Sequence, residues 1–247
     1  MEPGTFWLLV AGAASAGFVN GLAGFGTALF SLGFWLQVLP PVQAVALSVA
    51  VSVVTGMQGL WVVRHHILDQ PRRLLRFLIP ALVGVPLGLY ALAYIEPRPL
   101  KLLIAGFLIL YGLFFVARRA LPRFNRRTPG WDAFIGFLGG ILGGLAGLSG
   151  ALPAMWCALR PWPRQETRAV LQPFNVAVLG LTAAYLALRG AYDTATLQSL
   201  GIALGVAVVM AQLGIATFKR MNDSQFRWLL IVLMLLSGSA LMLREIA

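Results

Sequence analysis

The chain has 247 residues, of which 59% are hydrophobic and only 11% are charged, and its formal net charge is +11. Soluble domains carry about 25% charged residues, so this composition excludes an ordinary water-exposed domain and predicts a protein that crosses a membrane several times. The basic residues lie in short segments between apolar runs, which is typical of positive-inside topology and argues against nucleic acid as the reason for the charge.

Eight apolar runs follow one another along the chain, and six of them have the length of ordinary membrane spans. The runs are 5–39, 41–63, 74–95, 99–117, 131–159, 165–188, 196–218 and 225–243. The first and the fifth runs are longer, and each is interrupted near its middle by a glycine-rich segment, NGLAGFG at 20–26 and GGLAGLSG at 143–150. These two runs are therefore predicted to form broken helices.

The two halves of the sequence align as repeats. The glycine-rich segments lie 123 positions apart, and Pro40 and Pro163 are in the same register. Each half then consists of one broken segment followed by three spans, with the first repeat at 1–125 and the second at 126–247. Repeats of this kind are common in secondary transporters.

The positions of lysine and arginine discriminate between two topologies. If the broken segments are re-entrant hairpins, 15 of these residues lie in cytoplasmic loops and 4 lie outside; if they are full spans, the split is 11 to 8. The positive-inside rule favours the first. The expected arms of the first hairpin, 5–20 and 27–39, measure about 24 Å and about 20 Å as helices, shorter than a bilayer core of about 30 Å. We expect an all-α polytopic membrane protein made of two inverted repeats, each with one re-entrant hairpin and three transmembrane helices; eight full spans are the alternative.

The two glycine-rich breaks are candidate walls of a binding site. Irregular backbone at membrane depth is tolerated only where protein buries it or where it lines a wet cavity. The helix that follows each break starts with unpaired N–H groups and the positive end of its dipole, which together favour an anion. Close packing of helices through glycine is the alternative interpretation of the same residues.

Polar side chains recur at helical spacing on two of the spans. They are Arg168, Gln172, Asn175 and Thr182 on 165–188, and Ser48, Ser52 and Thr55 on 41–63, where Ser52 aligns with Asn175. Polar groups in lipid face protein or a cavity, although hydrogen bonds that only join helices remain an alternative. The predicted substrate-binding residues are Asn20, Gly21, Gly24, Gly26, Thr27, Ser52, Gly144, Gly147, Ser149, Gly150, Gln172 and Asn175. Arg168 is expected to attract the anion at the cytoplasmic mouth.

Other chemistries find little support in the sequence. Cys157 is the single cysteine, and the pair His65-His66 lies in a basic loop without a carboxylate or cysteine cluster, so no metal or other cofactor is expected. All eight acidic residues fall in loops or at span ends, which leaves no carboxylate for a proton relay at the middle of the membrane. A nucleophile with a nearby base is also missing, so an enzyme is not expected.

The segments 17–56 and 139–156 resemble the TauE/SafE sulfite-exporter family of membrane permeases, and the resemblance covers essentially the whole chain. It implies movement of sulfur-containing and organic anions such as sulfite, sulfonates and sulfoacetate. Six glycines correspond to the family's glycine positions: Gly21, Gly24, Gly26, Gly144, Gly147 and Gly150. Family members often have a proline just after the glycines. The second copy retains Pro153, whereas the first has Phe25, Thr27 and Phe30 in that region.

The expected function is therefore anion permeation by alternating access, in a multi-pass protein of the cell inner membrane. The expected partners are a small anionic substrate and lipid, without nucleic acid, and a homodimer is one possible assembly. Transport is expected to be uncoupled or to be coupled through the protonation state of the substrate. An anion channel of low selectivity and a structural membrane subunit without transport are the alternatives.

Overall fold

The computed structural model describes residues 3–69, 71–117, 128–162 and 164–222, together with five positions between 225 and 242. The elements within these ranges are helices. They are α1 (Pro3–Ala23), α2 (Thr27–Trp35), α3 (Pro41–Asp69), α4 (Pro71–Leu92), α5 (Pro97–Ala117), α6 (Pro129–Ala146), α7 (Ala151–Ala158), α8 (Arg164–Leu188) and α9 (Thr194–Arg220). The all-α polytopic fold class predicted from composition is confirmed.

The predicted spans correspond to helices one by one. The runs 41–63, 74–95, 99–117, 165–188 and 196–218 become α3, α4, α5, α8 and α9. The run 225–243 lies outside the described residues except for the five scattered positions, and the predicted boundary between the repeats, at 125, lies outside them as well. One expected length is wrong: α1 has 21 residues and is long enough to cross a membrane, so the entry arm of the first hairpin is not short.

Proline marks where many of the helices begin. Pro3, Pro41, Pro71, Pro97 and Pro129 each occupy the first position of a helix, where the missing N–H costs no hydrogen bond and the fixed φ suits the helix.

The connection between α8 and α9 uses side-chain hydrogen bonds instead. The Asp193 carboxylate accepts a hydrogen bond of 2.8 Å from the Thr196 N–H and caps α9, and hydrogen bonding to Thr196 lowers the pKa of Asp193. The Tyr192 hydroxyl donates to the Ala46 carbonyl oxygen at 2.9 Å, which ties the connection to α3.

The described helices have the surface of a membrane protein. Five of them are long and apolar enough to cross a membrane: α1, α3 over Pro41–Trp61, α4, α8 over Gln165–Leu188, and α9. On α4, Ile79, Val83 and Leu87 recur every four residues and are exposed. An apolar face of this kind would be unfavourable in water and is favourable against lipid.

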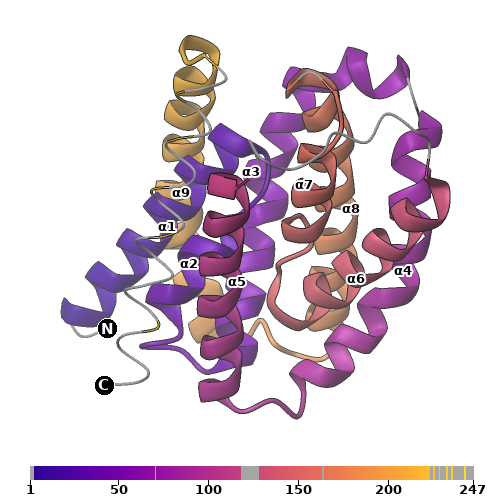
Figure 1. Cartoon of the computed structure of the whole chain (residues 1–247). Helices are drawn as coiled ribbons and strands as arrows, with labels where there is room; N and C mark the ends of the chain where they lie inside the picture. Colours follow the sequence, from indigo (N-terminus) through magenta and orange to yellow (C-terminus); the bar gives the residue numbers. More distant parts are fainter. Residues whose placement is uncertain are drawn as a thin grey trace.

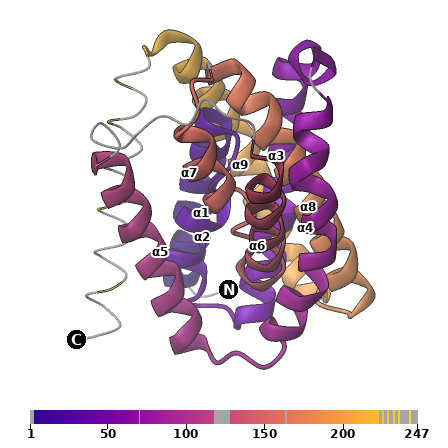
Figure 2. The ribbon, with the colours of Figure 1, turned by 45° about the vertical axis from the view of Figure 1, so that its right-hand side comes forward.

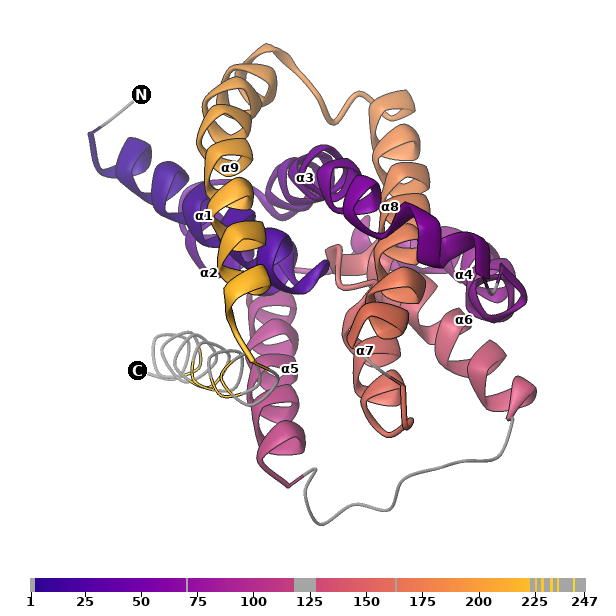
Figure 3. The same ribbon diagram turned by 90° about the horizontal axis from the view of Figure 1, so that it is seen from above.

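Two long helix pairs flank a central pair. Helix α1 packs along α9, α4 packs along α6, and α3 and α8 pack against each other between these outer pairs. The short helices α2 and α7 lie in the middle of the molecule (Figure 1), and α5 stands toward one side in the view of Figure 2. The core therefore lies around α2, α7, α3 and α8, with the long pairs on either side (Figure 3).

Glycine permits the closest approach in both outer pairs. A Cβ atom at Gly17 or Gly21 of α1 would overlap the backbone of Ala207 or Ala211 of α9, and one at Gly214 would overlap the Phe18 carbonyl oxygen. The α4 and α6 pair is built in the same way, because a Cβ atom at Gly140 would overlap the Ala81 backbone. Small residues that let backbones touch are the usual means of joining helices in lipid.

We expect Gly214→Ala to lower the thermal stability of the detergent-solubilised protein by several degrees, because the new methyl group forces α9 away from α1, and overpacking costs about 1–3 kcal/mol. Gly205→Ala on the same helix is the matched control, since a Cβ atom there meets open space, and alanine favours a helix by up to about 1 kcal/mol. Equal losses for the two variants would contradict the close approach.

Candidate functional site

The two predicted breaks are present in the structure, and both depend on glycine. Between α1 and α2, Gly24 and Gly26 have φ values of 81° and 93°, and Gly147 ends α6 with a φ of 68°. Only glycine adopts this left-handed region without a steric penalty. The sequence segments 20–26 and 143–150 thus contain the points at which the helices stop.

Each break is followed by a short helix that packs back against the helix before it. Helix α2 packs on α1 and α7 packs on α6. With nine and eight residues, α2 and α7 measure about 14 Å and about 12 Å, less than half of a bilayer core of about 30 Å. Pro153 lies in the first turn of α7, where its missing N–H is tolerated.

The tips of the two hairpins touch each other. A Cβ atom at Gly150 would lie 2.7 Å from the Cβ atom of Phe25, so that this glycine leaves room for a side chain of the other tip. A Cβ atom at Gly147 would lie 3.3 Å from the Cβ atom of Ala28, at the start of α2. Two segments about 120 positions apart in the sequence therefore form one buried junction.

Gln172 of α8 lies against the first tip in a space that three glycines leave open. A Cβ atom at Gly24 would overlap its Oε1 atom, and one at Gly59 of α3 would lie 2.6 Å from its Cδ atom. Its Nε2 atom donates a hydrogen bond of 3.0 Å to the Gly56 carbonyl oxygen. Because a carbonyl only accepts, this bond fixes the amide orientation, and Oε1 is left buried without a hydrogen-bond partner.

Asn175, one turn further along α8, lies at the second tip. Its Oδ1 atom accepts a hydrogen bond from the Ser149 hydroxyl, and both side chains are buried. Pro173 lies between Gln172 and Asn175 within the helix. Since proline has no N–H and interferes with the carbonyl four residues earlier, α8 is locally weakened at the level of its two amides.

Asn20, at the end of α1, binds α3. Its Nδ2 atom donates to the Ser52 carbonyl oxygen at 3.1 Å and to the Thr55 hydroxyl at 2.7 Å. Its Oδ1 atom has no hydrogen-bond partner, and the same is true of the hydroxyls of Ser52 and Thr27. Buried polar groups without partners cost about 1–3 kcal/mol each, so these groups are candidates for binding a ligand.

Arg168 is buried beside the first tip. Only 3% of its surface is exposed, its Nη2 atom donates to the Gly21 carbonyl oxygen at 3.0 Å, and its Cζ atom lies 4.6 Å from the centre of the Phe218 ring. Its Cγ atom lies 3.5 Å from where a Cβ atom of Gly24 would be. The guanidinium is thus enclosed within the helix bundle.

The predicted residues divide into two groups in the structure. Gly21 and Gly144 contact the backbones of α9 and α4, at Ala211 and Val85, and close helix packing accounts for them. The others gather at the joined tips or on the adjoining turns of α3 and α8. They are Asn20, Gly24, Gly26, Thr27, Ser52, Gly147, Ser149, Gly150, Gln172 and Asn175, with Arg168 beside the first tip.

The joined tips offer hydrogen-bond donors and positive charge. The first N–H groups of α2 lie at the first tip, and Arg168 adds a cation beside it. At the second tip fewer donors are free, because the Ala151 N–H donates to the Leu148 carbonyl oxygen at 3.2 Å and Pro153 has no N–H. The described residues contain no group of three or more metal-ligating side chains. This chemistry suits the binding of a small anion.

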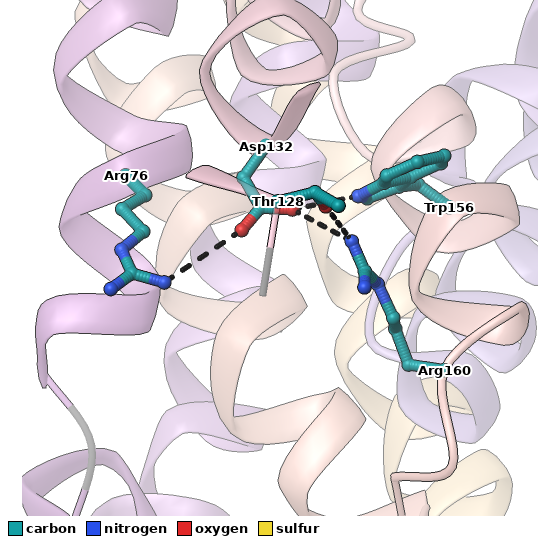
Figure 4. Close-up of polar contacts among 5 residues, drawn as sticks. All are labelled: Arg76, Thr128, Asp132, Trp156 and Arg160. Atoms are coloured by element: carbon teal, nitrogen blue, oxygen red, sulfur yellow. Dashed lines mark hydrogen bonds and ion pairs between the residues drawn. The ribbon is translucent and has the colours of Figure 1, made fainter. Parts of the chain in front are cut away.

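A charged cluster at the open end of the second hairpin has no counterpart in the sequence analysis (Figure 4). Asp132, in the first turn of α6, accepts a hydrogen bond of 2.8 Å from the Trp156 indole. Its carboxylate also forms an ion pair with Arg160 at 3.3 Å. Arg76 of α4 lies 4.0 Å away on the other carboxylate oxygen, and Arg160 also bonds to the Thr128 hydroxyl. Trp156 and Arg160 are four residues apart, which places them on one face of a helix. This spacing was the signal from which the cluster could have been predicted.

The cluster holds the two arms of this hairpin together. Asp132 belongs to α6, whereas Trp156 is on α7 and Arg160 follows it. The side chains of Asp132 and Arg160 are 8% and 4% exposed, so the pair is nearly dry, and removing one partner of such a pair leaves an uncompensated buried charge.

We expect Asp132→Asn to destabilise the folded protein by about 3–5 kcal/mol, because it removes the carboxylate from a nearly dry ion pair with Arg160. Glu166→Gln is the control, since its partner Arg73, at 2.6 Å, forms a pair that is 29% and 40% exposed, and such pairs contribute at most about 1 kcal/mol. Thermal unfolding in detergent measures both. A loss for Asp132→Asn no larger than that for Glu166→Gln would contradict the structural role of the cluster.

Comparison with known proteins adds one finding. The family model described as "Sulfite exporter TauE/SafE" matches residues 8–241 of the 247. No curated protein matches the chain.

Proposed function

Because this chain belongs to the sulfite exporter TauE/SafE family, whose model covers nearly all of it, we propose that it is a permease for small sulfur-containing or organic anions, of the sulfite, sulfonate and sulfoacetate class. Membership in this transporter family and the apolar helices support a membrane transporter.

The observation that carries the proposal is the buried junction of the two hairpin tips. Ser149 and Gln172 have no exposed surface, and Asn20 and Asn175 are nearly as buried. The oxygen atoms without partners on Asn20, Ser52, Thr27 and Gln172 lie around the same tips. Closed clusters of partly satisfied polar groups in an apolar bundle are where transporters hold their substrates.

An inverted repeat places the two tips at one point. Gly24 contacts Gln172, and Gly147 contacts Val49. Gly147 lies 123 positions after Gly24, and Gln172 lies 123 positions after Val49, so the two contacts are equivalent. The same shift of 123 positions relates the contact between Asn20 and Thr55 to the contact between Gly143 and Val178. The helices also support opposite orientations. The α3–α4 and α7–α8 connections lie at one end of the molecule, and the α4–α5 and α8–α9 connections lie at the other (Figure 1).

Alternating access is the mechanism that fits this arrangement. The tips are enclosed by α3 and α8 and by each other, so that neither side of the membrane reaches them in this conformation. Movement of one hairpin against the bundle would open the junction to one side while the other hairpin keeps it closed. The backbone N–H groups at the two tips that are not already bonded, with Asn175, Gln172, Ser52 and Ser149, would bind the oxyanion.

A multi-pass location in the cell inner membrane completes the proposal. The ends with the basic residues Arg72, Arg160 and Arg220 would face the cytoplasm by the positive-inside rule, and the α8–α9 connection with Arg189 would face outward.

Cysteine labelling in intact cells tests this orientation. In a Cys157→Ala background, we expect a membrane-impermeant maleimide to label Arg189→Cys in intact cells, and to label Arg72→Cys only after permeabilisation. Both native side chains are exposed. Labelling of the two positions on the same side would contradict the inverted arrangement.

Anion flux into liposomes tests the site. We expect Asn175→Ala and Gly24→Val to reduce saturable sulfite flux at least tenfold, because they remove a hydrogen-bonding amide and fill the space of Gln172. Thr182→Ala is the matched control on the same helix, since its hydroxyl donates to the Val178 carbonyl oxygen at 3.0 Å within α8, and it should leave flux unchanged.

The same experiment separates the alternatives. A channel of low selectivity would give flux that does not saturate with anion concentration, and a structural subunit would give none. Saturable flux that survives both Asn175→Ala and Gly24→Val would place the binding site elsewhere.

A further inference from the structure

We propose that Arg168 is the charge-balancing group of the binding site and that the permease therefore prefers oxyanions with a single negative charge. This inference rests on the proposed function and deepens it, because it specifies the charge of the substrate. The inference narrows the proposed substrate class to monoanionic sulfonates and hydrogensulfite. It sets aside the dianions of that class, fully ionised sulfite and sulfoacetate, together with sulfate.

The Arg168 guanidinium is buried with unused hydrogen-bonding capacity. Its Nη2 atom donates to a backbone carbonyl, that of Gly21, while Nε and Nη1 have no hydrogen-bond partner. The ring of Phe218, 4.6 Å away, compensates part of the charge through its π face. A buried cation normally has an ionic partner because its desolvation costs several kcal/mol.

That ionic partner is missing among the described residues. No carboxylate of the described part of the chain forms an ion pair with Arg168. Glu166, only two positions away, binds Arg73 at 2.6 Å, and Asp132 binds Arg160 and Arg76 at the far end of the second hairpin. Both carboxylates are thus engaged elsewhere, and the charge of Arg168 remains to be neutralised.

A bound monoanion neutralises this charge. With one cation and one anion, the buried site has no net charge, whereas a dianion would leave one negative charge in an apolar environment, where desolvation is most expensive. At the first tip the start of α2 supplies neutral N–H donors. The side-chain atoms nearest to a Cβ position at Gly24 belong to Gln172 and Arg168, of which only Arg168 is charged.

Gln172 reinforces the preference. Its Oε1 atom is held toward Gly24 by the bond from Nε2 to Gly56, and it accepts no hydrogen bond. An unpartnered acceptor repels the additional anionic oxygen of a dianion, and in hydrogensulfite it is satisfied by the O–H group of the ion. One turn of α8 therefore presents a cation and an acceptor on the same side of the first tip.

Flux measurements with anions of fixed and variable charge test the proposal. The purified protein is reconstituted in liposomes, and uptake is measured for methanesulfonate, which is a monoanion throughout, for sulfate, which is a dianion, and for sulfite, whose second ionisation lies near neutral pH. We expect saturable methanesulfonate flux that is independent of pH, sulfate flux at least tenfold lower, and sulfite flux that falls about tenfold per pH unit above that second ionisation.

Substitutions at Arg168 show whether this side chain sets the preference. Arg168→Lys keeps the charge and should keep the discrimination against sulfate, whereas Arg168→Gln should reduce methanesulfonate flux at least tenfold and remove the discrimination. The wild-type comparison does not depend on how well these variants fold. Sulfate carried as well as methanesulfonate by the wild-type protein would overturn the inference and leave the proposed function intact, while no saturable flux of any anion would overturn the proposed function itself.

Discussion

The interrupted helices can exist at membrane depth only because protein surrounds both interruptions. Lipid offers no hydrogen bonds to free backbone groups, so the ends of α1 and α6 and the starts of α2 and α7 must be enclosed. The structure achieves this by packing the two tips on each other, with Gly150 against Phe25 and Gly147 against Ala28. The positions of the central helices follow from that requirement, because α3 and α8 cover the junction from two sides.

The two hairpins meet this requirement with different chemistry at their open ends. In the first, the Trp35 indole donates to the Leu9 carbonyl oxygen at 3.1 Å; in the second, the Trp156 indole donates to the carboxylate of Asp132 at 2.8 Å. Leu9 and Asp132 are 123 positions apart, which is also the shift between the two glycine-rich segments. At this shift one hairpin uses an uncharged backbone acceptor and the other an ionised side chain. The second hairpin is therefore held by a nearly dry ion pair, whereas the first is held by packing and a hydrogen bond to a backbone carbonyl.

The site residues illustrate what spacing along one helix does and does not reveal. The amides of Gln172 and Asn175 were recognisable because two polar groups three positions apart in an apolar span require partners. Their actual partners come from different hairpins, since Gln172 lies against Gly24 and Asn175 binds Ser149. Gly56 and Gly59 make the space for Gln172, and their glycine spacing on α3 was a usable signal that the sequence analysis missed.

The sequence by itself determined the membrane class, most of the helices, the two glycine breaks and the family, because hydropathy, proline and glycine act locally and leave a pattern in the chain. Only the tertiary structure decided which glycines serve packing and which adjoin the site. Gly21 and Gly24 look equivalent in the sequence, yet the first contacts the backbone of α9 and the second has a positive φ beside Gln172. Tertiary packing likewise enclosed Arg168 and Asp132, which the sequence placed at a mouth and a span end. Burial depends on which distant helices cover a side chain, and that information is not contained in any one segment.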